Sequence, residues 1–180
     1  MRLRNIKTSV DKVLEWTLIV LMAANVLNVL WQVFTRFVLK NPSSFTEELA
    51  RYLLIWIGLL GASYVAGRKM HLAIDVVVNR LTGRVRRLAD YLIEVSIFVF
   101  AFFVMVFGGI RLVIITLTLN QISAVLRIKL GYVYLVLPLS GLLIMFYSIV
   151  FLSEIYRKQK DNQIDIQNSS TSQDYRTGAL

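Results

Sequence analysis

Four long apolar segments constrain the fold of this chain more than any other feature of its sequence. They lie at residues 16–39, 49–67, 91–119 and 131–153, and the last of them carries no charged residue. A helix that crosses a bilayer needs about 20 mostly apolar residues, because at about 1.5 Å per residue that length matches the hydrocarbon core. The third segment exceeds this length, so we expect it to tilt or to protrude. We therefore predict an all-α membrane protein with four transmembrane helices.

Composition excludes several other classes of protein. Hydrophobic residues make up 57% of the 180 residues and charged residues 17%, against about 45–50% and about 25% in soluble domains. The chain has no cysteine and a single histidine. Disulfides, thiol catalysis, cysteine-bound zinc and iron–sulfur clusters are thereby excluded. We expect no catalytic, cofactor or metal residue in this chain.

Residues 70–88, between the second and third segments, have the pattern of an amphipathic helix with a basic face. The apolar positions recur at helical spacing, and Arg80, Arg84 and Arg87 fall towards the other side. Such a helix is typical of the membrane interface, although the pattern also fits a half-exposed helix that packs on the protein's own bundle. Residues 1–156 then form a four-span membrane domain, and we expect the polar tail at 157–180 to be disordered.

Basic residues are distributed unevenly between the two sides that four spans define. Fourteen of the 20 lysines and arginines lie at the N-terminus, between the second and third segments, or in the tail, whereas the two other loops hold Lys40, Arg127 and Lys129. Because cytoplasmic flanks carry the excess of Lys and Arg, we predict that both termini are cytoplasmic. The net charge of +9 then reflects topology, and nucleic-acid binding is not needed to explain it.

The first segment carries a polar stripe at spacings of 3, 4 and 4 residues: Asn25, Asn28, Gln32 and Arg36. Amide side chains that face lipid are costly, so the stripe should face protein or a wet cavity. Hydrogen bonding between helices is the interpretation we favour over a substrate path. No carboxylate accompanies the stripe at membrane depth, so a proton relay lacks its usual acid.

Charged residues also open the second segment. Ser44-Phe45-Thr46-Glu47 fits a capping box, in which Glu47 would satisfy an orphan amide, and Glu47 and Arg51 form a favourable i,i+4 pair. With Glu48, Arg36 and Arg111, these residues fall towards the outer side and could form a belt of paired charges. We predict that Arg111 either pairs with a carboxylate or extends outward to the interface.

Two further patterns are candidates for structural or interface roles. Gly58 and Ala62, with Ala66 and Gly61, form a face of small residues that would let a second helix or another subunit approach closely. His71 and Asp75 stand four residues apart at the head of the amphipathic helix. Two residues do not make a metal site, so we interpret them as a local hydrogen bond. Trp56 and other aromatic residues lie mostly near the predicted interfaces, as in aromatic belts.

Several sequence blocks occur together in a fixed order: FTEELARY at 45–52, Trp56 with GLLGA at 58–62, and RKMHLAID at 68–75. Single positions extend the match into the last loop and the fourth segment, at Ser123, Leu130, Gly131, Tyr134, Pro138 and Gly141. Over about residues 16–153 the chain resembles the small membrane subunit of tripartite ATP-independent periplasmic (TRAP) transporters, the DctQ-like family. Arg127 and Lys129 depart from that family, which often has less charge there.

This resemblance implies a scaffold subunit of a sodium-coupled secondary transporter in a bacterial or archaeal inner membrane. The transported compound would be an organic acid, such as a dicarboxylate, sialic acid or another sugar acid. The implied partners are a large membrane subunit, which carries the substrate and sodium sites, a periplasmic substrate-binding protein, and membrane lipids around the spans.

Two other functions fit the sequence less well. A stand-alone four-helix exporter typically relies on a membrane-embedded glutamate, for which Glu94 is the only candidate. A membrane enzyme such as a thiol oxidase or a metalloprotease would need cysteines or a cluster of metal ligands, and one histidine supports neither.

Overall fold

A computed structural model describes residues 2–41, 43–68, 83–153 and 155. The helices in chain order are α1 (Arg2–Phe37), α2 (Ser44–Gly67), α4 (Gly83–Phe100), the π-helix η1 (Ala101–Gly108), α5 (Gly109–Thr118) and α6 (Leu130–Tyr134). Four helical stretches are long and apolar enough to cross a membrane: Ile6–Phe37, Ser44–Gly67, Tyr91–Thr118 and Leu130–Ser153. The predicted fold class, an all-α membrane protein with four spanning helices, is confirmed. We refer to these stretches as the first to fourth spans.

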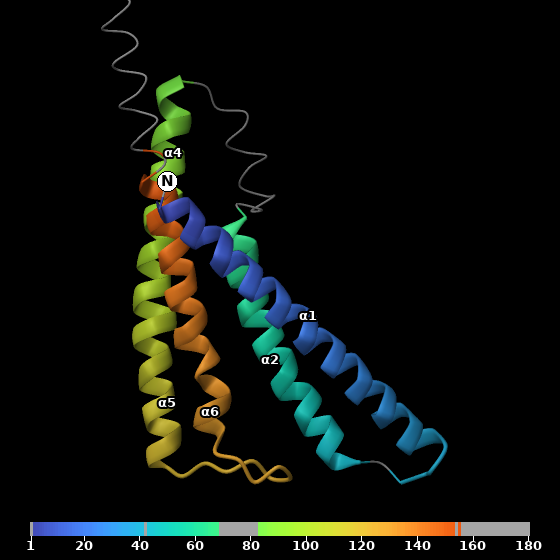
Figure 1. Cartoon of the computed structure of the whole chain (residues 1–180). Coiled ribbons are helices and arrows are strands. Elements are labelled where there is room, and N and C mark those ends of the chain that lie inside the picture. The colour runs from blue at the N-terminus through green and yellow to red at the C-terminus, as the bar shows by residue number, and fades with distance from the viewer. Residues whose placement is uncertain (1, 42, 69–82, 154, 156–180) are drawn as a thin grey trace, which may run out of the picture.

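The third span belongs to a longer continuous helix. α4, η1 and α5 follow one another without a break from Gly83 to Thr118, and in Figure 1 the α4 end extends beyond the ends of the neighbouring helices. Residues 83–88, the last part of the amphipathic stretch predicted at 70–88, form the start of α4 in the structure. The reason is that Val85, Leu88 and Leu92 continue the helical spacing into the span. The rest of that predicted helix lies in 69–82, outside the described residues, as does the tail from 156 onward.

The third and fourth spans form an antiparallel hairpin whose contacts depend on glycine. A Cβ atom on Gly131 would lie 2.5 Å from Cγ of Leu117, and one on Gly141 would lie 2.8 Å from Cβ of Met105. Since real Cβ atoms do not approach so closely, these glycines let the two helices pack nearer than larger residues would permit. Gly141, near Pro138, therefore leaves room for η1.

The first two spans form a second hairpin, and the two hairpins meet through the second and fourth spans (Figure 1). Leu14, Leu60 and Val136 form one buried cluster, which joins helices of both hairpins. Ala101, Met105 and Ile144 form another, against which Leu59 and Ala66 pack. The start of α1 and the end of the fourth span lie at one end of the molecule, and the 38–43 and 119–129 connections lie at the other.

Candidate functional site: a polar ladder between the second and fourth spans

Three side chains of α2 form hydrogen bonds to backbone atoms on or next to the fourth span. Glu48 accepts from the amide of Val125, Trp56 donates to the carbonyl of Val133, and Ser63 donates to the carbonyl of Ser140. Each bond joins residues 77 positions apart in the chain. A constant separation means that the two helices run parallel in a fixed register, with one bond about every two turns. We call these three bonds the polar ladder.

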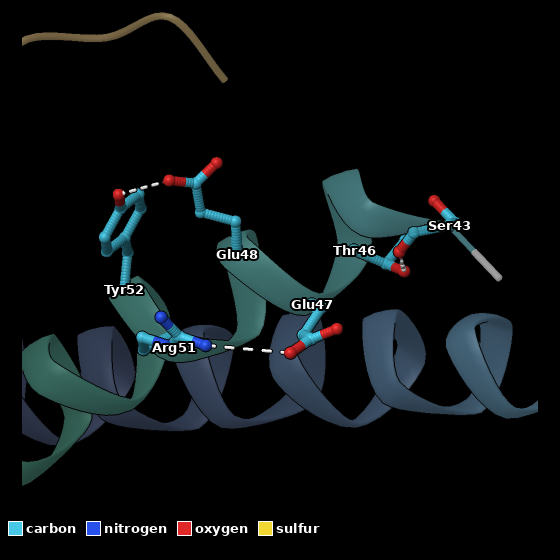
Figure 2. A network of polar contacts seen from close by, with 6 residues as sticks. All are labelled: Ser43, Thr46, Glu47, Glu48, Arg51 and Tyr52. Carbon is cyan, nitrogen blue, oxygen red and sulfur yellow. Dashed lines mark hydrogen bonds and ion pairs between the residues drawn. The ribbon is translucent and has the colours of Figure 1, made fainter. Parts of the chain in front are cut away.

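The outermost bond fastens the 119–129 loop to the first turns of α2. One carboxylate oxygen of Glu48 accepts from the backbone amides of Val125 at 2.9 Å and Leu126 at 3.1 Å. The other accepts from the hydroxyl of Tyr52 at 2.6 Å (Figure 2). Ser123 Oγ also accepts from the Leu126 amide, at 3.2 Å. By accepting from two loop amides, the Glu48 carboxylate replaces the backbone acceptors that these amides would have in a regular helix or strand.

The two inner bonds lie within the apolar part of the bundle. Trp56 Nε1 donates to the Val133 carbonyl at 3.1 Å. The Ser63 side chain is fully buried, and its hydroxyl lies 3.2 Å from the Ser140 carbonyl and 3.0 Å from the Leu59 carbonyl of its own helix. Polar groups in hydrocarbon need a partner, and both side chains find one in the backbone of the protein.

A second set of contacts holds α1 at the opposite end of the bundle. The hydroxyl of Tyr147 donates to Asp11 Oδ1 at 2.6 Å, which links the fourth span to α1. Arg68 and Glu15 form an ion pair with a nitrogen–oxygen distance of 3.5 Å, which links α2 to α1. The Arg68 guanidinium also lies 4.7 Å from the ring centroid of Tyr64. The two hairpins are therefore joined to each other at both ends of the bundle.

The polar stripe of α1 does not act as one unit. Asn28 Nδ2 donates to the Thr46 carbonyl of α2 at 2.7 Å, as expected for hydrogen bonding between helices. Asn25 Oδ1 is buried and has no hydrogen-bond partner in the part of the chain that the structure describes. Gln32 is half-buried, and Arg36 is exposed one residue before the end of α1.

The charged residues at the start of α2 divide between two sides of the helix (Figure 2). Glu47 pairs with Arg51 at 3.6 Å, both well exposed, whereas Glu48 faces the loop. The capping box predicted at 44–47 does not form, because the N-cap is Ser43, one residue earlier, and its side chain makes no capping bond. The Thr46 hydroxyl donates instead to the Ser43 carbonyl.

The remaining candidate residues from the sequence do not take part in the polar ladder. Arg111 lies exposed on α5, and it has no ion pair within the described ranges. The belt of paired charges is thus reduced to Glu47 with Arg51. Gly58 and Ala62 are exposed, and a Cβ atom on Gly58 or Gly61 would meet nothing within 4 Å. His71 and Asp75 lie outside the described residues.

Three contributors to these contacts were not recognised as such from the sequence. The position of Trp56 indicates an aromatic belt, and none of the predicted motifs includes Ser63 or the Asp11–Tyr147 pair. The spacing of Glu48, Trp56 and Ser63, at 8 and 7 residues, is a signal that could have placed all three on one side of α2. Their partners could not have been found in the same way, because backbone atoms carry no sequence pattern.

Four apolar spans, of which the second and the fourth are joined by side-chain-to-backbone hydrogen bonds, define a multi-pass membrane protein. The chain belongs to the family of DctQ components of tripartite ATP-independent periplasmic transporters, which matches residues 25–158. The family is one of transport components, and the resemblance read from the sequence is confirmed.

Three relatives place the chain within this family. The sialic acid TRAP transporter permease protein SiaT of Haemophilus influenzae is 28% identical over 141 residues, which are 76% of this chain and 22% of SiaT. A putative TRAP transporter small permease protein of H. influenzae is 24% identical over 79% of this chain and 86% of its own length. The sialic acid TRAP transporter small permease protein SiaQ of Vibrio cholerae is 29% identical over 55% of this chain and 57% of its own.

Proposed function

We propose that this chain is the scaffold subunit of a sodium-coupled TRAP transporter that imports an organic acid. In this role it braces a large permease subunit, which carries the substrate and sodium sites, and a periplasmic binding protein delivers the substrate. The chain itself then needs no cofactor. The observation that carries the proposal is the polar ladder, which fixes two helical hairpins as one body.

The type of bond in the ladder suits a scaffold. Each of its three bonds uses a backbone amide or carbonyl on the fourth-span side, and backbone atoms move only when the main chain itself moves. A subunit that changed shape during transport would have to break the two inner bonds, whose donors and acceptors would then be left without partners in hydrocarbon. The arrangement therefore favours a rigid frame over a moving carrier.

An apolar groove of about 250 Å³ beside the ladder gives further support. It is lined by aliphatic and aromatic residues of α1, α2, the loop and α6: Leu21, Leu49, Tyr52, Leu53, Trp56, Ile128, Tyr132 and Val133. An organic anion needs charged or hydrogen-bonding partners when it leaves water. The groove suits a lipid chain or an apolar helix better than such an anion.

The relatives supply the remaining parts of the proposal. This chain matches 22% of the permease protein SiaT. We infer that a large permease subunit is the partner that this chain braces. Two of the three relatives are named for sialic acid, which makes sialic acid the first compound to test, with dicarboxylates and other sugar acids next.

The proposal includes the topology and the membrane-surface helix. Both termini lie in the cytoplasm, as the distribution of basic residues indicates, and the protein resides in a bacterial or archaeal inner membrane. The amphipathic pattern that begins at residue 70 would hold the subunit at the cytoplasmic surface.

Reconstitution in vesicles tests the proposal directly. The small subunit, the large subunit, and both together are placed in separate vesicles with the binding protein outside, and uptake of labelled sialic acid is measured with and without an inward sodium gradient. We expect uptake only when both subunits are present and only with the gradient. Uptake by vesicles that hold the small subunit alone would contradict the scaffold role and favour the stand-alone transporter.

A further inference from the structure

Arg111 is a charged residue inside a span that the described part of the protein does not neutralise. It is exposed on α5 and has neither an ion pair nor a hydrogen-bond partner in the ranges that the structure describes. By contrast, Arg51 pairs with Glu47, Arg68 with Glu15, and Glu48 binds backbone amides. An arginine within a span is rare, costly and usually functional.

The depth of Arg111 makes it hard to satisfy from the membrane surface. It lies seven residues before Thr118, the last residue of α5, which places its Cα about 10 Å from the helix end. The Cα–Cβ bonds of a helix tilt toward its N-terminus, so the Cα–Cβ bond of Arg111 points toward η1 and away from the end of α5. Arg36, in contrast, lies one residue from the end of α1 and reaches the interface easily.

The surroundings of Arg111 on α5 have the form of a contact surface. Gly108, the last residue of η1, lies about one turn before Arg111 on the same side of the helix. The space beside it is open, since a Cβ atom on Gly108 would meet only the Phe103 carbonyl of the same helix, at 3.7 Å. Phe107 and Ile114, on either side of Arg111, are 66% and 58% exposed. A bare stretch of backbone beside a charged group lets a second helix approach closely enough to accept its hydrogen bonds.

We propose that the face formed by the end of η1 and by α5, which we call the Arg111 face (Gly108, Arg111 and Ile114), is covered by the large permease subunit, and that the Arg111 guanidinium pairs there with an acidic side chain. The inference rests on the proposed function, because it takes the large subunit as the partner. A guanidinium in hydrocarbon needs a compensating charge, and a carboxylate offers one with matching planar geometry. The face of Gly58 and Ala62 on α2 carries no charge and so has no comparable requirement.

Site-specific photo-crosslinking in the membrane tests where the large subunit lies. Ile114 is replaced by benzoylphenylalanine, and Leu54, which is 62% exposed on α2, is replaced in the same way as a matched control. We expect a covalent adduct with the co-expressed large subunit from position 114 and not from position 54. An adduct from position 54 alone, or only lipid adducts from position 114, would overturn the proposal.

Substitution of Arg111 tests the charge pair. We expect R111L to lower the amount of large subunit that co-purifies with the small one by about tenfold or more, as for truncation of a buried interfacial charge. R111K should retain part of it, and R36L should have no effect. Thermal unfolding of the small subunit alone should not change in R111L, because Arg111 has no ion pair or hydrogen bond to remove within the described residues.

G108L provides an independent variant, since a larger residue at this open position fills the space that the partner helix needs. G58L is its control on α2. If wild-type small and large subunits do not co-purify, the proposed function fails. If they do, and both R111L and G108L retain the large subunit, only the assignment of the Arg111 face is wrong.

Discussion

Individual side chains of α2 stabilise the fold by binding backbone atoms, and this makes their roles unequal. Glu47 and Glu48 are neighbours in the sequence, yet one forms an exposed ion pair and the other binds two loop amides. Exposed ion pairs contribute little to stability, whereas a carboxylate that binds amides leaves those amides without partners when it is removed. The two glutamates should therefore respond differently to the same substitution.

We expect E48A to loosen the 119–129 loop and E47A to leave it unchanged. Loss of the carboxylate frees the amides of Val125 and Leu126, so their hydrogen exchange should accelerate, and the thermal midpoint should fall. Exchange measured by mass spectrometry on the detergent-purified protein reports both. Equal behaviour of E48A and E47A would show that the carboxylate does not hold the loop.

Gly67 is a second position where a single added atom would disturb the packing. A Cβ atom there would lie 2.6 Å from the ring of Tyr147, whose hydroxyl binds Asp11. We expect G67A to cost about 1–3 kcal/mol of unfolding free energy through overpacking, because the ring must shift and weaken the bond to α1. Reversible unfolding in mixed micelles measures this cost. G58A, at an open position of the same helix, should cost far less.

At the scale of helices, the ladder predicts how the two hairpins hold together. Hydrogen bonds between membrane helices contribute about 0.6 kcal/mol on average, so S63A should lower stability by roughly that amount. W56F should cost more, because the smaller ring also loses packing against the cluster of Leu14, Leu60 and Val136. T17V is the control, since the Thr17 hydroxyl binds only the Val13 carbonyl of its own helix. Unfolding of the single and double variants checks the expectation. Effects no larger than that of T17V would mean that the bonds contribute nothing between the hairpins.

The spans could be predicted from the sequence because apolar runs and their lengths reflect the membrane directly. The Glu47–Arg51 pair could be predicted because i,i+4 spacing places both on one side of a helix. The capping-box prediction was wrong because the sequence alone does not show where the helix starts. A motif that lies one residue away from the true N-cap fits the pattern equally well. Residues 83–88 of the predicted amphipathic stretch lie at the start of α4, a boundary that periodicity alone does not mark.

The ladder and the Asp11–Tyr147 bond could not be predicted, and the reason is physical. They join residues at least 77 positions apart, and their geometry depends on how two hairpins dock. Hydropathy and spacing describe each helix separately. Trp56 shows the difference, since its position suggests an interface residue while its indole nitrogen serves as a donor to the Val133 carbonyl.

At the scale of the whole molecule, the proposed topology has a direct test because the chain contains no cysteine. N41C and A124C introduce single thiols at exposed positions in the two connections at one end, and S9C introduces one at the other end. A maleimide that does not cross membranes should label N41C and A124C in intact cells, and S9C only after the membrane is opened. The reverse pattern would place both termini outside.

The constant separation of 77 residues along the ladder also has a consequence for biosynthesis. When α2 has entered the membrane, the backbone atoms that will bind Glu48, Trp56 and Ser63 have not yet been made. At about 5–20 residues per second, a ribosome needs about 4–15 s to synthesise them. During this time the first hairpin is in the bilayer, and the indole N–H of Trp56 does not yet have the Val133 carbonyl as its acceptor. An insertion factor that shields nascent hairpins would act in that interval, and its substrate would be the half-built protein.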